Sequence, residues 1–215
     1  MLQQRLLVRF MLVCSAAALV TTPIFAAKDY AATGEMTNAE RAYLLSELKS
    51  SEAGVLTSIK GLTPAQWKFK PSPDGWSIEE CTEHLILAED LISKEAQKAL
   101  QAPAVARLPN AASDGDRQLV AQMEDRSKKA KAPKVIQPTG MFSTPESAAQ
   151  EFRHLRDKTI AYVNTTTDPL RVHVGAGPAG AAADVYQFIL EMSAHSVRHT
   201  AQISDVKSSP GYPSS

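Results

Sequence analysis

The chain has 215 residues, of which 44% are hydrophobic and only 6% are aromatic, so it can bury one core and form a single domain with a tail. Its 23 Lys and Arg residues balance 23 Asp and Glu residues, which gives a formal net charge of zero. This balance excludes a nucleic-acid binder that relies on a generally basic surface.

The first 27 residues have the pattern of a secretory signal peptide. Arg5 and Arg9 precede an apolar run over residues 10–20, no acidic residue occurs, and small residues close the segment. A membrane anchor is the alternative, but the apolar run is shorter than the roughly 20 residues that a span needs. We therefore expect residues 1–27 to direct export to the periplasm or the medium, without a stable membrane anchor.

Removal of this segment changes the charge and the cysteine content. The mature chain loses two of its basic residues and no acidic one, so 21 bases face 23 acids and the net charge becomes −2. Cys14 is also lost, which leaves Cys81 as the only thiol and excludes an internal disulfide. Residues 28–35, which follow the signal peptide, are expected to be disordered.

Helix-start signals divide the first half of the mature chain. A capping box at Thr37–Glu40 opens an amphipathic helix that ends at Gly61, and a second signature at Thr63–Gln66 opens a single turn carrying Trp67. A third capping box, Ser77–Glu80, opens a helix that fades near residue 101.

Residues 102–142 are rich in Ala, Pro, Lys and Asp and predict a long linker, with at most one helix around residues 118–130. A basic run in this linker has no interleaved aromatic residues, so it indicates a solvated loop rather than a nucleic-acid patch. The run consists of Arg126, Lys128, Lys129, Lys131 and Lys134.

Two further helices complete the domain. One begins at an S-x-x-E signature over Ser143–Glu146, and the other spans about Asp184 to Lys207, before an extended tail over residues 208–215. No convincing strand pair occurs. The pattern predicts an all-α fold, an antiparallel four-helix bundle with long crossover loops, over residues 36–207.

Two histidines on the last helix are candidate metal ligands. His195 and His199 are four residues apart, roughly 40° from each other on a helical wheel, and both lie in the middle of the apolar stripe. Neighbouring buried imidazoles repel if charged, and each neutral ring needs a partner. A shared divalent metal ion meets both needs, although each residue could also be an ordinary core or interface histidine.

His84 is the third candidate ligand and lies at the edge of the apolar stripe of the helix that begins at Ser77, where by itself it could equally be a boundary residue. In a bundle, facing helices assemble metal sites from inward side chains. Three histidines with open coordination positions are typical of a catalytic rather than a structural ion. His154 is expected to face solvent and His173 to lie in a loop, so both are excluded from the site.

Three polar residues lie near these positions, and none is assigned as a catalytic base. Gln202, one turn after His199, could donate a hydrogen bond to a ligand, a water molecule or the substrate, or it could simply cap a polar layer. The first role of Glu80 is in its capping box. Glu191, one turn before His195, could orient a ligand.

Two other features have simpler explanations. Residues 175–180 spell G-x-G-x-x-G, but a dinucleotide site needs a βαβ unit, so a loop leading into the last helix is favoured. Cys81 lies on the apolar face of its helix and is expected to be a small core residue, although it could approach the metal.

Three motifs occur in order along the chain: LTPAQW at residues 62–67, GWSIEECTEHL at residues 75–85, and H-x-x-x-H-x-A-Q at residues 195–202. Together they resemble the DinB-like superfamily of metal-dependent hydrolases, over about residues 36–213. The resemblance implies a four-helix bundle with one divalent metal ion, often nickel or zinc, with iron also a candidate. It implies three histidine ligands, which correspond here to His84, His195 and His199.

The resemblance also implies candidate reactions. Members of known activity include S-transferases that use low-molecular-weight thiols such as bacillithiol or mycothiol, and related isomerases. Some relatives carry a second histidine where this chain has Arg198, so the role of that position is open. The expected export is a further departure, because a cytosolic thiol would be scarce outside the cell.

Two hypotheses follow for the function. The first is an exported metal-dependent hydrolase or thiol S-transferase that acts on an unknown small molecule, with a low-molecular-weight thiol as a candidate cosubstrate. The second is a non-catalytic metal- or ligand-binding bundle, which could be a homodimer. Neither involves nucleic acid.

Overall fold

The computed structural model describes residues 33–108, 113–127, 131–177 and 181–214. The predicted signal peptide and residues 28–32 lie outside the described residues, as do Lys128 and Lys129. Within the described part of the chain, no helix is both long enough and apolar enough to cross a membrane.

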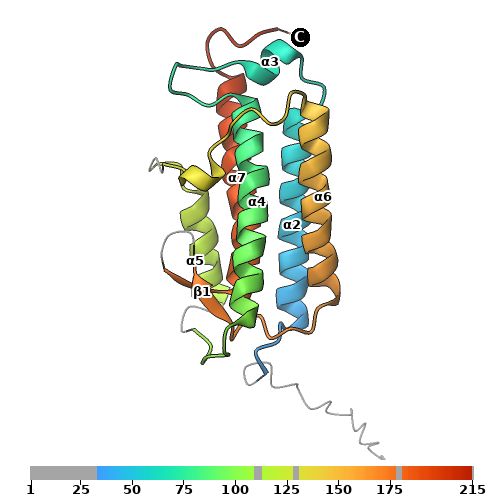
Figure 1. The fold of residues 1–215 in the computed structure, drawn as a ribbon, viewed down its shortest axis with the longest axis vertical. Helices are drawn as coiled ribbons and strands as arrows, with labels where there is room; N and C mark the ends of the chain where they lie inside the picture. Colours follow the sequence, from blue (N-terminus) through green and yellow to red (C-terminus); the bar gives the residue numbers. More distant parts are fainter. Residues whose placement is uncertain (1–32, 109–112, 128–130, 178–180, 215) are drawn as a thin grey trace, which may run out of the picture.

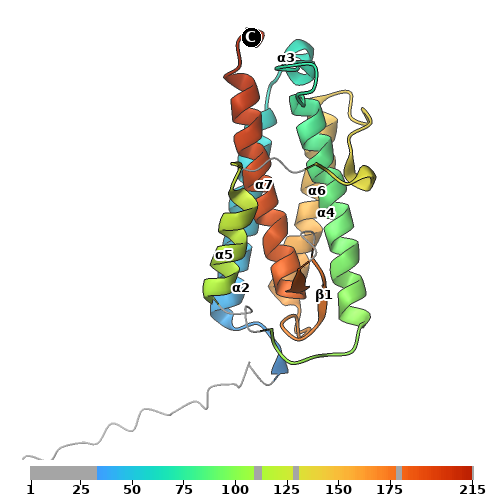
Figure 2. The ribbon, with the colours of Figure 1, turned by 90° about the vertical axis from the view of Figure 1, so that its left-hand side faces the viewer.

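Four long helices form the bundle (Figures 1 and 2). They are α2 (Asn38–Ile59), α4 (Ile78–Gln101), α6 (Pro145–Thr165) and α7 (Val185–Lys207). Helices α2 and α4 each pack against both α6 and α7. The connection between α4 and α6 returns the chain to the end of the bundle where α4 begins, so these two helices run parallel (Figure 1). The prediction of a four-helix bundle with a long crossover is confirmed.

The capping signals place most helix starts correctly. Thr37, Thr63 and Ser77 each accept a hydrogen bond from the backbone N–H three residues later, and they open α2, α3 (Pro64–Lys68) and α4. The predicted box at residues 143–146 is wrong by one residue, because the N-cap of α6 is Thr144, which accepts from the Ser147 N–H. Pro145 then occupies the first helical position, where its missing N–H costs nothing.

The described parts of the predicted linker contain more regular structure than their composition indicated. It contains α5 (Ser113–Glu124) and a 3₁₀ turn, η1 (Lys134–Ile136), and α5 packs along α7. The helix expected around residues 118–130 therefore begins and ends earlier than predicted. Tertiary contacts hold the segment: Asp116 pairs with Arg171, and Arg126 pairs with Asp205 of α7.

A short hairpin corrects the expectation that no strands pair. Strands β1 (Val174–Ala176) and β2 (Ala182–Asp184) are antiparallel, with Val174 opposite Asp184. Three-residue strands are too short for alternation to be recognised in the sequence. The G-x-G-x-x-G motif begins inside β1, and its last three residues, 178–180, lie outside the described residues. Strand β2 follows the motif and leads directly into α7, so no βαβ unit surrounds the described part of it.

The two ends of the domain are fastened to the bundle. Residues 208–212 form turns and not the predicted extended tail, and the Tyr212 ring packs edge-on against Phe69 at 5.5 Å. At the other end, the Gly34 carbonyl accepts a hydrogen bond from the Arg171 N–H at 2.9 Å, so residues 33–35 belong to the folded domain.

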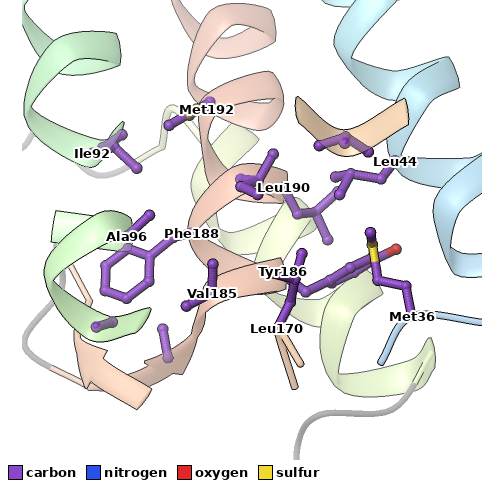
Figure 3. Close-up of a cluster of buried hydrophobic side chains, with 14 of the residues drawn as sticks. Met36, Leu44, Ile92, Ala96, Leu170, Val185, Tyr186, Phe188, Leu190 and Met192 are labelled. Carbon is purple, nitrogen blue, oxygen red and sulfur yellow. The ribbon is translucent and has the colours of Figure 1, made fainter. Parts of the chain in front are cut away.

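A buried polar layer lies between two hydrophobic clusters. One cluster gathers around the N-terminal half of α7 (Figure 3), and the other contains Trp67 and the C-terminal half of α7. Between them, fully buried Arg156 of α6 pairs with Glu89 of α4 through two hydrogen bonds of 2.8 Å. The same guanidinium also donates to the Leu48 carbonyl of α2 and to Ser196 of α7, so one side chain joins all four helices.

Candidate metal centre

The bundle brings three predicted histidines together. His84 comes from α4, and His195 and His199 come from consecutive turns of α7, which packs beside α4. One ring nitrogen of each lies within 4.8 Å of the others. The Nε2 atom of His195 is 3.2 Å from Nε2 of His84 and 3.0 Å from Nε2 of His199.

The hydrogen bonds of these rings constrain their protonation. His84 Nδ1 lies 2.8 Å from the Ile136 carbonyl oxygen, so it carries the proton and donates to it. In neutral His84 the Nε2 atom is then a lone-pair acceptor that faces His195. In its neutral forms, His195 Nε2 either donates one hydrogen bond or accepts one, so it can form a hydrogen bond with His84 Nε2 or with His199 Nε2 but not with both. One of these two short contacts therefore lacks a hydrogen bond in every neutral arrangement.

Burial keeps the three rings neutral. His84 is 3% exposed and His199 is 6% exposed, whereas His195 is partly exposed. Burial lowers the pKa of His84, and burial together with the neighbouring histidines lowers the pKa of His195 to about 3 and that of His199 to about 2. An interaction with Gln202 acts in the opposite direction on His199. Neutral imidazole is the form that binds a metal ion.

The arrangement fits a divalent cation. Nitrogen atoms bound at about 2.0–2.1 Å to one tetrahedral zinc ion lie roughly 3.3 Å apart, close to the 3.2 and 3.0 Å that separate His195 Nε2 from the Nε2 atoms of His84 and His199. A shared cation would also relieve the facing lone pairs. Among the described residues, buried Nδ1 of His199, the ring nitrogen on the other side from the cluster, makes no hydrogen bond.

A tryptophan packs against two of the histidines and also lines a cavity. The Trp76 ring lies 4.9 Å from that of His84 and stacks at 6.2 Å on that of His199, measured between ring centroids. Trp76 also lines a cavity of about 370 Å³. The sequence placed Trp76 in a motif but gave it no role, because its position just before the N-cap of α4 does not reveal which ring it contacts.

Two hydrogen-bonding groups around His84 were not predicted from the sequence. The Ile136 carbonyl lies in the segment expected to be a solvated linker, and the Glu83 carboxylate accepts backbone hydrogen bonds from the same segment. No periodic signal marks either contact, since both join α4 to residues more than 50 positions away.

The other candidate residues occupy different environments. Gln202 lies beside His199, and its supporting role stays a prediction. Glu80 completes the capping box with Ser77 and pairs with Lys70 at 2.8 Å. Glu191 is 4% exposed, and burial raises its pKa to about 7.

The residues assigned to other roles lie outside the histidine group. Cys81 is fully buried in the core, and burial raises the pKa of its thiol to about 12. His154 is exposed, as expected, and His173 Nδ1 pairs with the Ala102 carbonyl. Arg198 donates to backbone carbonyls at the C-terminal end of α5.

Comparison with known proteins identifies the family. A model of the DinB superfamily matches residues 47–203. The chain belongs to the DinB superfamily. It is 29% identical over 150 residues to the uncharacterized protein YuaE from Bacillus subtilis (strain 168). This match covers 69% of this chain and 88% of YuaE.

A solved structure supports the fold of this superfamily member. YfiT from Bacillus subtilis, described as a probable metal-dependent hydrolase with an unusual four-helix bundle topology, matches with a TM-score of 0.55 at 15% identity. The match covers 83% of this chain and 91% of YfiT. At this identity the likeness establishes the shared bundle fold.

Proposed function

We propose that this DinB-superfamily protein is a metal-dependent hydrolase or thiol S-transferase that acts on a small molecule. His84, His195 and His199 would hold one divalent ion, with nickel, zinc and iron as the candidates. The observation that carries the proposal is the convergence of three neutral, largely buried imidazoles whose Nε2 atoms face one another.

The site leaves room for a reacting molecule. Three ligands leave at least one coordination position open, and an ion there would lower the pKa of a water or thiol that reaches it. His195 is partly exposed, which is consistent with access from solvent. The proposal places the remainder of a small substrate in the cavity lined by Trp76, whose ring packs against His84 and His199.

The part of the chain that the structure describes offers no accessible thiol for S-transfer. Cys81 is fully buried, and the raised pKa of its thiol keeps it protonated at neutral pH. A thiol nucleophile would therefore come from solution, which is consistent with a low-molecular-weight thiol as cosubstrate. If no thiol is used, water is the nucleophile and the reaction is a hydrolysis.

Metal analysis tests the proposal directly. The protein purified after reconstitution with nickel, zinc or ferrous iron should retain about one ion per chain by mass spectrometry. His195→Ala and His199→Ala should lose that ion, whereas His154→Ala, a change of the same residue type at an exposed position, should retain it. A wild-type protein that retains no divalent ion would contradict the proposal.

Turnover separates the enzyme from the non-catalytic alternative. The metal-loaded protein is screened against panels of esters, amides and electrophiles, the last with and without low-molecular-weight thiols. Activity that disappears in His199→Ala and persists in His154→Ala supports catalysis. Metal binding without any histidine-dependent turnover would favour a metal- or ligand-binding bundle, and light scattering on the same samples tests for a homodimer.

Export is part of the proposal and has its own test. Residues 1–27, with their two arginines and apolar run, are fused to a reporter enzyme that becomes active only outside the cytoplasm. The fusion should give an active, cleaved reporter in the periplasm or the medium. A reporter that stays inactive, or that stays uncleaved in the membrane, would contradict export of a free protein.

A further inference from the structure

Glu83, the residue immediately before His84 on α4, has an unusual set of partners. It is fully buried, and both carboxylate oxygens accept hydrogen bonds from one short segment. Oε1 accepts from the N–H and the hydroxyl of Thr139 at 2.7 and 3.0 Å, and Oε2 accepts from the N–H groups of Gly140 and Met141 at 2.8 and 3.0 Å. A buried carboxylate is tolerated when such donors replace its hydration, so this contact is a strong anchor.

The anchored segment, residues 131–142, is here called the strap. Gly140 has φ +87°, a conformation that favours glycine and that turns successive N–H groups toward the same carboxylate. At the end of the strap, the Trp67 indole N–H donates to the Phe142 carbonyl at 3.1 Å. The strap is therefore fastened to both α3 and α4.

The strap also determines how the His84 ring is oriented. Its Ile136 carbonyl accepts the Nδ1–H of His84 at 2.8 Å, which fixes the tautomer and leaves the Nε2 lone pair facing His195. Without that acceptor, a neutral imidazole can exchange tautomers and rotate. Outer partners of this kind commonly change metal affinity by about 10–100-fold when they are removed.

We propose that Glu83 is a positioning residue: by anchoring the strap, it holds the Ile136 carbonyl against His84 Nδ1 and so presents His84 Nε2 to the metal. The consequence for the metal rests on the proposed function, whereas the consequence for the His84 tautomer does not. The strap also supplies four of the residues that line the cavity beside Trp76. These are Lys131, Ala132, Gln137 and Pro138.

Glu83→Gln is the informative variant, because it keeps the size of the side chain but removes its charge and turns an amide N–H₂ toward N–H donors. Glu79→Gln is the matched control, since Glu79 is an acidic residue one turn earlier on α4 and is partly exposed. Gly140→Ala is the second variant if Glu83→Gln does not fold. It strains the positive φ without removing a buried charge, and no atom lies within 4 Å of the added Cβ.

Two measurements use the metal-free protein. Amide hydrogen exchange at residues 139–141 reports the anchor, and the ¹⁵N chemical shifts of His84 report which ring nitrogen is protonated. A third measurement, competition with a chelator for zinc, reports metal affinity. We expect Glu83→Gln to accelerate exchange at least tenfold, to mix the His84 tautomers and to weaken zinc binding about 10–100-fold. Gly140→Ala should act in the same direction, and Glu79→Gln should change each quantity less than twofold.

The outcomes separate this proposal from the proposed function. If Glu83→Gln, or Gly140→Ala in its place, accelerates exchange but keeps the His84 Nδ1 proton and wild-type zinc affinity, the positioning role is wrong. If wild-type protein binds no metal while the variant still mixes the tautomers, the proposed function fails and the positioning of His84 by Glu83 stands.

Discussion

The metal-free protein should lose stability when the pH falls from 7.5 to 5.0, because the folded protein holds buried His199 and partly exposed His195 in their neutral forms. Their pKa values in the folded protein, about 3 and about 2, lie below the 6.5 of an ordinary histidine. Below pH 6.5 the unfolded chain therefore binds protons at these residues that the folded chain does not bind. The free energy of unfolding then decreases as the pH falls.

The size of this loss follows from the two pKa values. At pH 5.0, protonation of one histidine in the unfolded chain is worth about 2 kcal/mol when the folded form stays neutral, so the two residues together cost about 4 kcal/mol. Below pH 5.5 the slope approaches about 2.7 kcal/mol per pH unit. This is a large fraction of the roughly 5–15 kcal/mol that stabilises a typical domain.

Urea denaturation followed by circular dichroism, with a chelator present, measures this loss at pH 7.5, 6.5, 5.5 and 5.0. The double variant His195→Asn/His199→Asn removes both groups, and His154→Asn removes an exposed histidine as the control. The comparison uses the change with pH, since the substitutions also alter stability at neutral pH. Equal pH dependence in the wild type and the double variant would refute the reasoning.

Three further perturbations probe other parts of the domain. Glu89→Ala should lower the free energy of unfolding by about 3–5 kcal/mol, because it leaves buried Arg156 without its carboxylate partner. Lys94→Ala, at an exposed ion pair, should lower it by less than about 0.5 kcal/mol, and similar urea midpoints for the two variants would contradict this prediction. In metal-free protein, Glu191→Gln should stabilise the fold by roughly 3 kcal/mol at pH 8 and by little at pH 4. Burial raises the pKa of Glu191 to about 7, so its ionised form destabilises the folded protein at pH 8. An unchanged Tm at pH 8 would show that the buried carboxylate does not destabilise the fold. Gly34→Ala should destabilise by about 2 kcal/mol, because φ is +70° and the added Cβ would come 2.5 Å from a valine side-chain carbon; an unchanged Tm would show that this turn can adjust.

Local signals in the sequence determined the helices and the candidate ligands. Capping residues act on backbone groups three positions away, so Thr37 and Ser77 could be recognised without knowledge of the fold. The spacing of His195 and His199 placed both on the inner face of one helix for the same reason. The pairing with His84 needed one more assumption, a bundle in which α4 lies beside α7, and the structure confirms that arrangement.

The surroundings of the histidines depended on contacts between distant residues. The strap has the composition of a solvated loop, and it is ordered because the Glu83 carboxylate and the Trp67 indole bind its backbone. Helix α5 lies where it does because Asp116 pairs with Arg171, 55 positions away. Periodicity and capping report only neighbours along the chain, so the sequence alone determined which side chains could bind a metal. Tertiary packing alone decided which backbone groups and which cavity surround them.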